Sequence, residues 1–172
     1  EKIIEAASDL RGLFDAMNGM TALGEAERER LLETVADRAY PPRRAELVAR
    51  SDDAAGTGGW YRWENGSGRR WIAPAAAAQG VRFESLEEIT ASEPDLAARI
   101  IERVRAARKI ALAAALDGIA RETVVLYVPR GVRTGGDFLL DAALSEAGRL
   151  GAMRVWTLLE DDSEATFTLN LR

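Results

Sequence analysis

The sequence predicts an α+β fold: a mixed sheet of about five strands packed by two helices, with an N-terminal helical hairpin. Three observations support this class. Residues 2–39 place apolar side chains at helical spacing, and residues 60–73 have the alternation of a β-hairpin. A β-branched, nearly all-apolar run occupies 123–128, and a second strand is predicted at 153–159. With 172 residues and 47% hydrophobic content, the chain is long enough for one ordinary domain and a small appendage. We therefore expect a helical appendage or interface at 1–42 and an α+β domain at 43–172.

Two amphipathic helices are predicted near the N-terminus, at 2–17 and 24–39. Asn18-Gly19 favours a stop after the first, and Pro41-Pro42 ends the second. Such a hairpin must bury its apolar stripe. The stripe packs either on the domain's own sheet or against a protein partner, including a second copy of the chain.

The central third of the chain is predicted to begin with a loop at 51–59 and the Trp-rich hairpin 60–73. An Ala-rich connector, 74–80, leads to a short strand at 81–83. The longest helix is predicted to start after Ser92, which is a suitable N-cap, and to run to about Ala120.

The C-terminal third is predicted to be strand, helix, strand and strand. The nearly all-apolar segment 123–128 indicates a central strand covered on both faces. A helix is predicted at 137–150, so that 123–128 and 153–159 form a parallel pair joined by a helical crossover. A polar turn at 160–164 then leads to 165–171, whose alternation is typical of a half-buried antiparallel strand.

Composition excludes several chemistries. The chain has no cysteine and no histidine, which rules out disulfides, ordinary zinc sites, and Cys–His or Ser–His–Asp catalysis. A net charge of −5 disfavours a dedicated DNA-coating protein but leaves room for a local basic patch. No cofactor, catalytic residue or metal ligand is assigned from the sequence.

Codon bias and targeting signals bear on the source and location. Of the 23 basic residues only Lys2 and Lys109 are lysines, and alanine is abundant, a bias that GC-rich codons produce and that favours a bacterial source. No stretch approaches the ~20 apolar residues of a membrane span, and no signal-peptide pattern is present. We expect a soluble cytoplasmic protein that does not contact membrane, and, because residue 1 is not Met, a fragment or processed form.

The first candidate site is the hairpin itself. If Asn65–Gly68 forms a four-residue turn, Glu64 opposes Arg69 and Arg62 opposes Trp71, and at least one indole should be partly exposed. Aromatic and guanidinium groups together suit single-stranded nucleic acid, a nucleotide or a protein partner. The alternative is a hairpin whose residues satisfy one another through cross-strand and cation–π contacts. The candidate residues are Trp60, Arg62, Trp63, Arg69, Arg70 and Trp71.

The second candidate is the loop that follows the strand 123–128. Ligands bind at the carboxyl ends of strands in open α/β sheets, and a helix starting at 137 would favour an anion there. Arg130 and Arg133 would assist, and Gly135 and Gly136 complete the candidate residues, while Asp137 and Asp141 would compete with an anion at the same helix start. The spacing matches no phosphate-binding motif, so an ordinary turn is the alternative.

Two charged surfaces complete the candidates. Arg99 and Arg103 share one face of the long helix, and Arg105, Arg108 and Lys109 form another cluster. This is either a solvated basic face or a nucleic-acid footprint. Acidic residues gather at 160–164 and at 84–88, and a metal site would need carboxylates to converge from separate strands. Asp52, Asp53 and Glu84 are candidates for that, with Lys109 or Arg70 as charge partner.

The residues therefore favour a non-catalytic binding or adaptor domain of a bacterial protein or assembly. It would contact an anionic ligand or a protein partner through an Arg/Trp surface, with self-association possible through helices 2–17 and 24–39. One alternative is a divalent-metal-dependent nuclease or phosphotransferase using Asp and Glu ligands. Another is an acidic inhibitor or immunity-type protein that blocks a basic partner.

Overall fold

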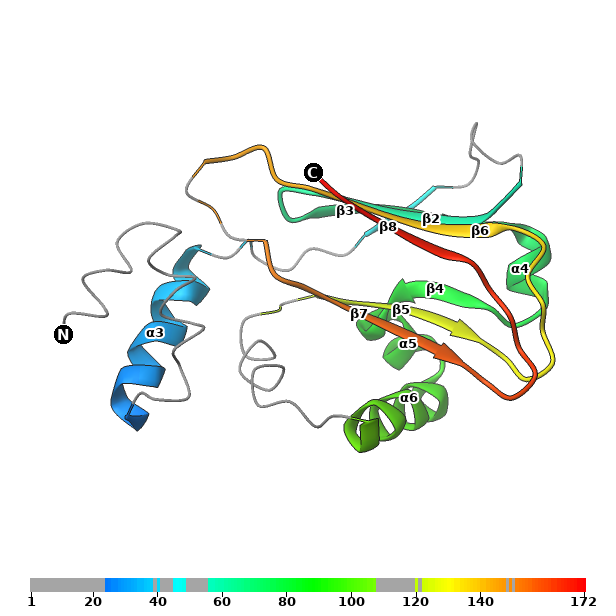
Figure 1. Cartoon of the computed structure of the whole chain (residues 1–172), viewed down its shortest axis with the longest axis horizontal. Helices are drawn as coiled ribbons and strands as arrows, with labels where there is room; N and C mark the ends of the chain where they lie inside the picture. The colour runs from blue at the N-terminus through cyan, green and yellow to red at the C-terminus, as the bar shows by residue number, and fades with distance from the viewer. Residues whose placement is uncertain are drawn as a thin grey trace.

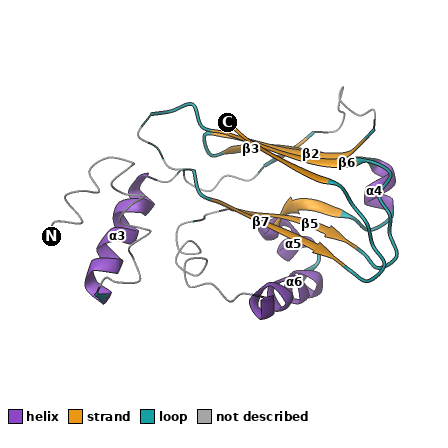
Figure 2. Ribbon diagram, in the orientation of Figure 1, coloured by secondary structure: helices purple, strands orange, loops and turns teal. Residues whose placement is uncertain are grey.

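The computed structural model describes residues 24–38, 40, 45–48, 56–107, 120, 122–147, 149 and 151–172. Two β-sheets lie face to face, and two helices cover the outer face of the smaller sheet (Figure 1). In Figure 2 those two helices lie against the smaller sheet, while the other described helices lie beside the sheets and at one end of them. This arrangement confirms the α+β class.

The larger sheet has five strands in the order β1-β3-β2-β6-β8. Their bounds are Glu46–Leu47, Ser67–Ile72, Thr57–Glu64, Asp137–Ala143 and Phe167–Leu171, respectively. Only β2 and β3 pair antiparallel, while the β1–β3, β2–β6 and β6–β8 pairs are parallel. The predicted mixed sheet of about five strands is present, but the strands predicted at 123–128 and 153–159 lie in a second, smaller sheet.

The smaller sheet has the order β4-β5-β7, with bounds Arg82–Ser85, Glu122–Val128 and Met153–Leu159. β5 is covered on both faces, as predicted. Val124 and Leu126 lie in the core between the sheets, while Val125 and Tyr127 pack with the helices. β5 and β7 are parallel, which was also predicted.

Two helices cover the smaller sheet, α5 (Leu86–Ser92) and α6 (Pro94–Ala107). α6 confirms the start of the long helix, and residues 108–119 lie outside the described residues. Ser92 is not its cap, because it ends α5 and its hydroxyl donates to the Glu88 carbonyl at 2.9 Å. α5 was not predicted, although its capping box of Ser85 and Glu88 is a visible sequence signal.

Residues 137–143 form a strand, so the helix predicted at 137–150 is wrong. Phe138 and Leu140 alternate inward and are fully buried, and β6 hydrogen-bonds β2 on one side and β8 on the other. The apolar residues of this segment fit both helical spacing and strand alternation. Hydrogen bonding to β2 and β8 stabilises the strand. The Ala-rich connector, in contrast, forms the short helix α4 (Pro74–Ala78).

The last four strands alternate between the two sheets. β5 and β7 lie in the smaller sheet, and β6 and β8 in the larger one, so β7 stacks beside β5 and β8 beside β6. The segments that connect β5 to β6 and β7 to β8 also run side by side and are joined by a parallel bridge between Arg133 and Glu164. The crossover is therefore a strand of the other sheet instead of a helix. β8 is parallel to its neighbour instead of antiparallel, because residues 160–166 cross between sheets.

The space between the sheets is filled by aromatic and aliphatic side chains. Phe83 of β4 contacts Phe138 and Phe167 edge-on, at ring-centroid distances of 5.5 Å and 6.2 Å. The ring centroid of Tyr61 lies 6.1 Å from that of Phe83. Such offset contacts add about 0.5–1.5 kcal/mol per pair to area burial, so this cluster holds the sheets together.

The helix predicted at 24–39 is present as α3 (Glu25–Arg38), which lies to one side of the sheets in Figure 1. Leu31 and Val35 of its apolar stripe are buried. The helix predicted at 2–17 lies outside the described residues. None of the helices in the described part of the chain has the length and apolar character that a bilayer span requires.

Candidate functional site

β2 and β3 form the predicted hairpin, with a register that differs by two residues. Arg62 lies opposite Arg69, and Trp60 opposite Trp71. The turn is Asn65-Gly66 alone, with φ values of 48° and 80°, the geometry of a type I′ hairpin. The four-residue turn at 65–68 was therefore wrong, although the Asn-Gly dipeptide was a strong signal. Because the pairing register differs from the prediction by an even number of residues, every side chain of the hairpin stays on the predicted face of the sheet.

The three indoles of the hairpin are buried, which contradicts the expectation of a partly exposed tryptophan. Trp60, Trp63 and Trp71 are only 5–6% exposed. The Arg62 guanidinium lies 4.8 Å from the centre of the Trp60 ring, and Tyr40 meets Trp63 edge-on at 5.8 Å. These rings therefore contribute to the core and offer little surface to a ligand.

The hairpin arginines contact carboxylates. Arg62 approaches Asp141 at 4.0 Å, and Arg69 approaches Glu46 at 3.7 Å, both with exposed guanidinium side chains. A groove of about 500 Å³ includes both of them. Its charged lining consists of Arg62, Glu64, Arg69, Asp141, Glu146 and Arg172. Three acidic and three basic side chains line this groove, and Arg62 and Arg172 both lie within 4.0 Å of Asp141.

Arg70 is the buried arginine of the hairpin, and it joins β3 to the helical layer. Its Nη2 donates to Glu84 at 2.9 Å and to Glu88 at 3.1 Å. Burial raises the pKa of Glu84 in spite of the Arg70 charge. Burial also acts to raise the pKa of Glu88, but hydrogen bonds from Ser85 and the Arg70 charge outweigh it and leave that pKa below its usual value. Two carboxylates thus compensate one buried cation.

A second buried polar pair lies between the sheets. The Tyr61 hydroxyl donates to the Glu122 carboxylate. Burial raises the pKa of Glu122, opposed by hydrogen bonds from Tyr61 and Trp63. Burial also raises the pKa of Tyr61, and the Glu122 charge adds to that. Both groups are titratable and face the core, so they make stability depend on pH.

The glycine-rich loop after β5 does not form an anion site at a helix start, because β6 begins there. Gly136 serves close backbone packing: a Cβ on it would lie 2.5 Å from the Gly58 nitrogen. Gly135 and Gly136 line a shallow groove of about 280 Å³ whose described lining contains no charged residue. Arg133 pairs its backbone with Glu164 instead. Of the four candidate residues in and after this loop (Arg130, Arg133, Gly135 and Gly136), only Arg130 shares a described groove with other arginines.

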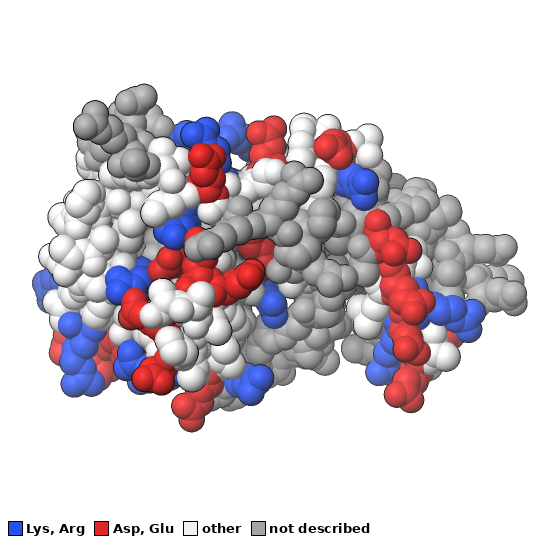
Figure 3. Space-filling model, turned by 180° about the vertical axis from the view of Figure 1, so that it is seen from behind, with Lys and Arg blue, Asp and Glu red and all other residues white. Residues whose placement is uncertain are grey.

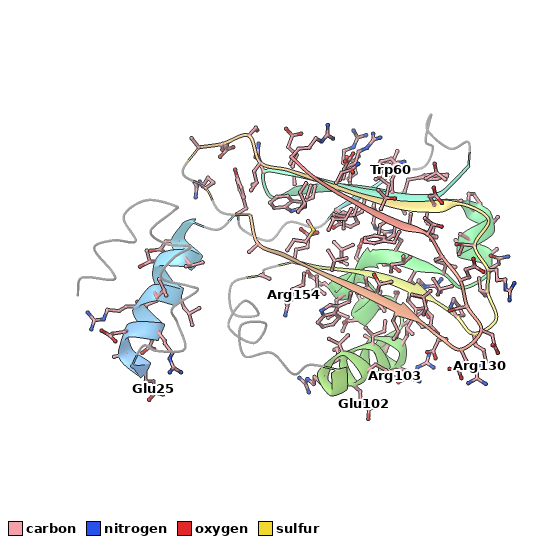
Figure 4. All side chains as sticks on the ribbon, viewed as in Figure 1. Glu25, Trp60, Glu102, Arg103, Arg130 and Arg154 are labelled. Carbon is pink, nitrogen blue, oxygen red and sulfur yellow. The ribbon has the colours of Figure 1, made fainter. Side chains whose placement is uncertain are left out.

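Arg130 meets the basic face of α6. A groove of about 780 Å³ lies at the carboxyl end of β5, lined by Arg99, Glu102, Arg103, Tyr127, Pro129, Arg130 and Glu160. One helical turn separates Arg99 from Arg103, which places both over the end of the strand. Figure 4 shows Arg103, Glu102 and Arg130 near one another, with Trp60 across the molecule on the larger sheet. We call this the arginine groove.

The two ion pairs inside the arginine groove differ in exposure. Arg103 approaches Glu160 at 3.7 Å, and the Arg103 side chain is 65% exposed while the Glu160 side chain is only 15% exposed. Arg130 pairs with Asp161, and both side chains are mostly exposed. The acidic turn predicted at 160–164 thus supplies partners to the arginines. The described residues contain no cluster of three or more acidic side chains able to hold a metal, and Asp52, Asp53 and Lys109 lie outside them.

Arg99 and Arg103 were predicted to lie in one candidate site and Arg130 in another. Their convergence follows from α6 packing on β5, where Ile100 joins Val125 and Tyr127 in one buried cluster. The signal available was the carboxyl-end position of Arg130 combined with an apolar face on α6. The view from behind shows acidic and basic side chains interspersed over the described residues, without one broad basic surface (Figure 3).

Comparison of the chain with protein-family models, curated proteins and solved structures found no match. The site's own geometry therefore carries the functional argument.

Proposed function

We propose that the chain is a non-catalytic binding domain that holds an anionic group of a ligand or partner protein in the arginine groove. The observation that carries this proposal is the convergence of Arg99, Arg103 and Arg130 at the carboxyl end of β5. The contact belongs there rather than at the hairpin, because the hairpin indoles are buried and Arg70 is paired with two carboxylates.

Guanidinium groups suit this role because each presents a planar fork of donors that matches phosphate and carboxylate oxygens. Arg130 and Asp161 form an exposed ion pair, and such pairs are worth only about 0–1 kcal/mol. Arg103 approaches the mostly buried Glu160 at 3.7 Å, but its own side chain is 65% exposed. An incoming anion therefore exchanges with Asp161 at low cost and reaches Arg103 from solvent. The groove volume of about 780 Å³ lies within the range of small-molecule sites and accommodates a nucleotide.

Binding is tested with two fluorescent probes, an oligodeoxythymidylate and a polyglutamate peptide, with pyrophosphate as competitor. Anisotropy titrations at about 50 mM and about 200 mM salt measure affinity and its salt dependence. We expect Arg103→Ala and Arg130→Ala each to weaken binding about tenfold, the loss of one charge-assisted hydrogen bond of about 1.5 kcal/mol. The salt slope should fall by about one for each arginine removed if the ligand is a nucleic acid.

The matched control is Arg69→Ala, which removes an equally charged and similarly exposed arginine on the larger sheet. This variant should bind as the wild type does. The two probes separate a nucleic-acid ligand from an acidic protein partner. Binding that Arg69→Ala weakens as much as Arg130→Ala, or no binding of either probe to the wild type, would overturn the proposal.

A further inference from the structure

The two sheets end in open edges on the same side of the molecule. Among the described strands, β8 hydrogen-bonds only β6 and β7 only β5, so each is the last strand of its sheet. Both are drawn in front of their neighbours in Figure 1. The unpaired backbone groups of an edge strand are a template for pairing with another chain.

The β8 edge exposes side chains that point toward the interior of the sandwich. The register places Leu169 beside Leu140, which is fully buried, and Leu171 beside Ala142. Leu169 and Leu171 therefore lie on the core-facing side of the larger sheet, yet they are 46% and 73% exposed. Leu159 at the end of β7 lies beside the buried Val128 and is 41% exposed. The core is thus uncovered along this edge.

β8 lacks the features that protect edge strands from pairing. Its sequence, Phe-Thr-Leu-Asn-Leu, contains neither a charged residue nor a proline. Natural edges are usually protected by lysine, proline, a bulge or a covering helix. This edge is uncharged, regular and apolar on its inner side, which suits it to extend the sheet.

The same sequence is complementary to itself in the antiparallel direction. If two copies of β8 are related by a two-fold axis that passes between their Leu169 residues, Phe167 faces Leu171 of the second copy. Thr168 then faces Asn170 of the second copy. Apolar positions meet apolar ones, polar positions meet polar ones, and no like charges face each other.

We propose that β8 pairs antiparallel with β8 of a second copy of this chain, forming a two-fold dimer with one continuous larger sheet. The two sheets lie face to face, so the same axis also brings the two β7 edges together. Dimer formation covers Leu159, Leu169 and Leu171. The self-complementary strand selects a second copy over another partner, and an isologous contact of this kind closes without forming a fibre.

The oligomeric state is measured by sedimentation equilibrium over a wide concentration range. We expect a dimer whose dissociation constant rises at least 100-fold in Leu169→Lys, because two ammonium groups then meet at the axis. The matched control is Leu47→Lys, which changes a leucine of similar exposure, 58%, on the opposite edge of the same sheet. It should remain a dimer.

Disulfide trapping tests the register and does not depend on a lysine variant that folds. The chain has no cysteine, so Leu169→Cys introduces a single thiol. Paired residues on antiparallel strands have Cα atoms about 4.5–5.5 Å apart, within the range that a disulfide bridges. Oxidation should convert this variant to a covalent dimer. Leu171→Cys should not cross-link to itself, because its two copies lie about 14 Å apart at about 3.4 Å per residue.

Three results would overturn the proposal. A wild-type monomer at all concentrations would mean that another segment or partner covers the edge. A dimer that survives Leu169→Lys would place the contact elsewhere, for example on α3. Cross-linking of Leu171→Cys in preference to Leu169→Cys would exclude this register. None of these results depends on anion binding in the arginine groove, so the two proposals fail separately.

Discussion

Arg70 shows how a residue noticed for binding serves the fold instead. In sequence it stands among three tryptophans and two other arginines, a composition typical of a contact surface. In the structure it is 8% exposed and donates to Glu84 and Glu88. The sequence did raise Arg70 as a charge partner for Glu84. It could not show that a second layer covers this face, because burial depends on packing between distant segments.

Glu122 gives the clearest pH dependence. Burial raises its pKa above the ordinary value of 4.5, so folding favours the protonated carboxyl. The wild type therefore gains stability from this group as pH falls from 7 toward 4.5 and loses it as pH rises through the folded-state pKa. Glu122→Gln removes that contribution. We therefore expect the variant to lose stability relative to the wild type as pH falls. The loss is about 1.4 kcal/mol for each unit by which the pKa of Glu122 is higher in the folded than in the unfolded protein.

Urea unfolding at several pH values between 4.5 and 7 measures this difference. Glu84 and Glu88 are present in both proteins, so their contributions to the pH dependence cancel when the two unfolding free energies are subtracted. Glu87→Gln removes a charge from an exposed position of α5 and serves as the control. A Glu122→Gln difference that stays flat, or that grows on acidification, would show that the carboxyl is not held in a desolvated site.

At the scale of elements, the hairpin turn was recognisable in sequence and was still assigned the wrong length. Asn65-Gly66 accepts two positive φ angles, and this lets β2 reverse into β3 within two residues. The same argument explains why residues 137–143 misled the prediction. Their side chains satisfy both periodicities, and hydrogen bonding to β2 and β8 selects the strand.

Gly66 is constrained both by its backbone conformation and by its surroundings. Its φ is +80°, and an added Cβ would lie 2.7 Å from the Tyr40 Cβ. Gly131 has a similar φ of +72°, but nothing lies within 4 Å of its added Cβ. Gly131→Ala should therefore cost about 1–2 kcal/mol through the backbone alone, and Gly66→Ala should cost more. Denaturant unfolding of both variants measures the difference, and equal losses would mean that Tyr40 moves aside freely.

At the scale of the whole molecule, the sequence predicted the class of fold, the mixed sheet and the parallel pairing of 123–128 with 153–159. The class and the mixed sheet follow from local patterns, and the apolar run 123–128 indicates a buried strand. The parallel pairing is correct, but it was predicted from a helical crossover at 137–150, where the structure has the strand β6. The alternation of β5, β6, β7 and β8 between two sheets does not follow from local patterns, because a polar segment such as 160–166 permits either a hairpin or a crossing between sheets. The direction of β8 was wrong for this reason.

The arginine groove is likewise a property of the assembled layers. Arg99 and Arg103 come from α6, Arg130 from the loop after β5, and Glu160 from the end of β7. Each residue was visible in sequence, and Arg99 and Arg103 were already predicted to share a face. Only the packing of α6 on β5 brings that face to Arg130, and the groove then presents three guanidinium groups to solvent.

A crystal structure of the protein with pyrophosphate would show whether the arginine groove holds an anion. We expect one well-ordered anion in contact with the guanidinium groups of Arg103 and Arg130 at the carboxyl end of β5. An anion bound instead between Arg62, Arg69 and Arg172 on the larger sheet, with the arginine groove unoccupied, would contradict this expectation.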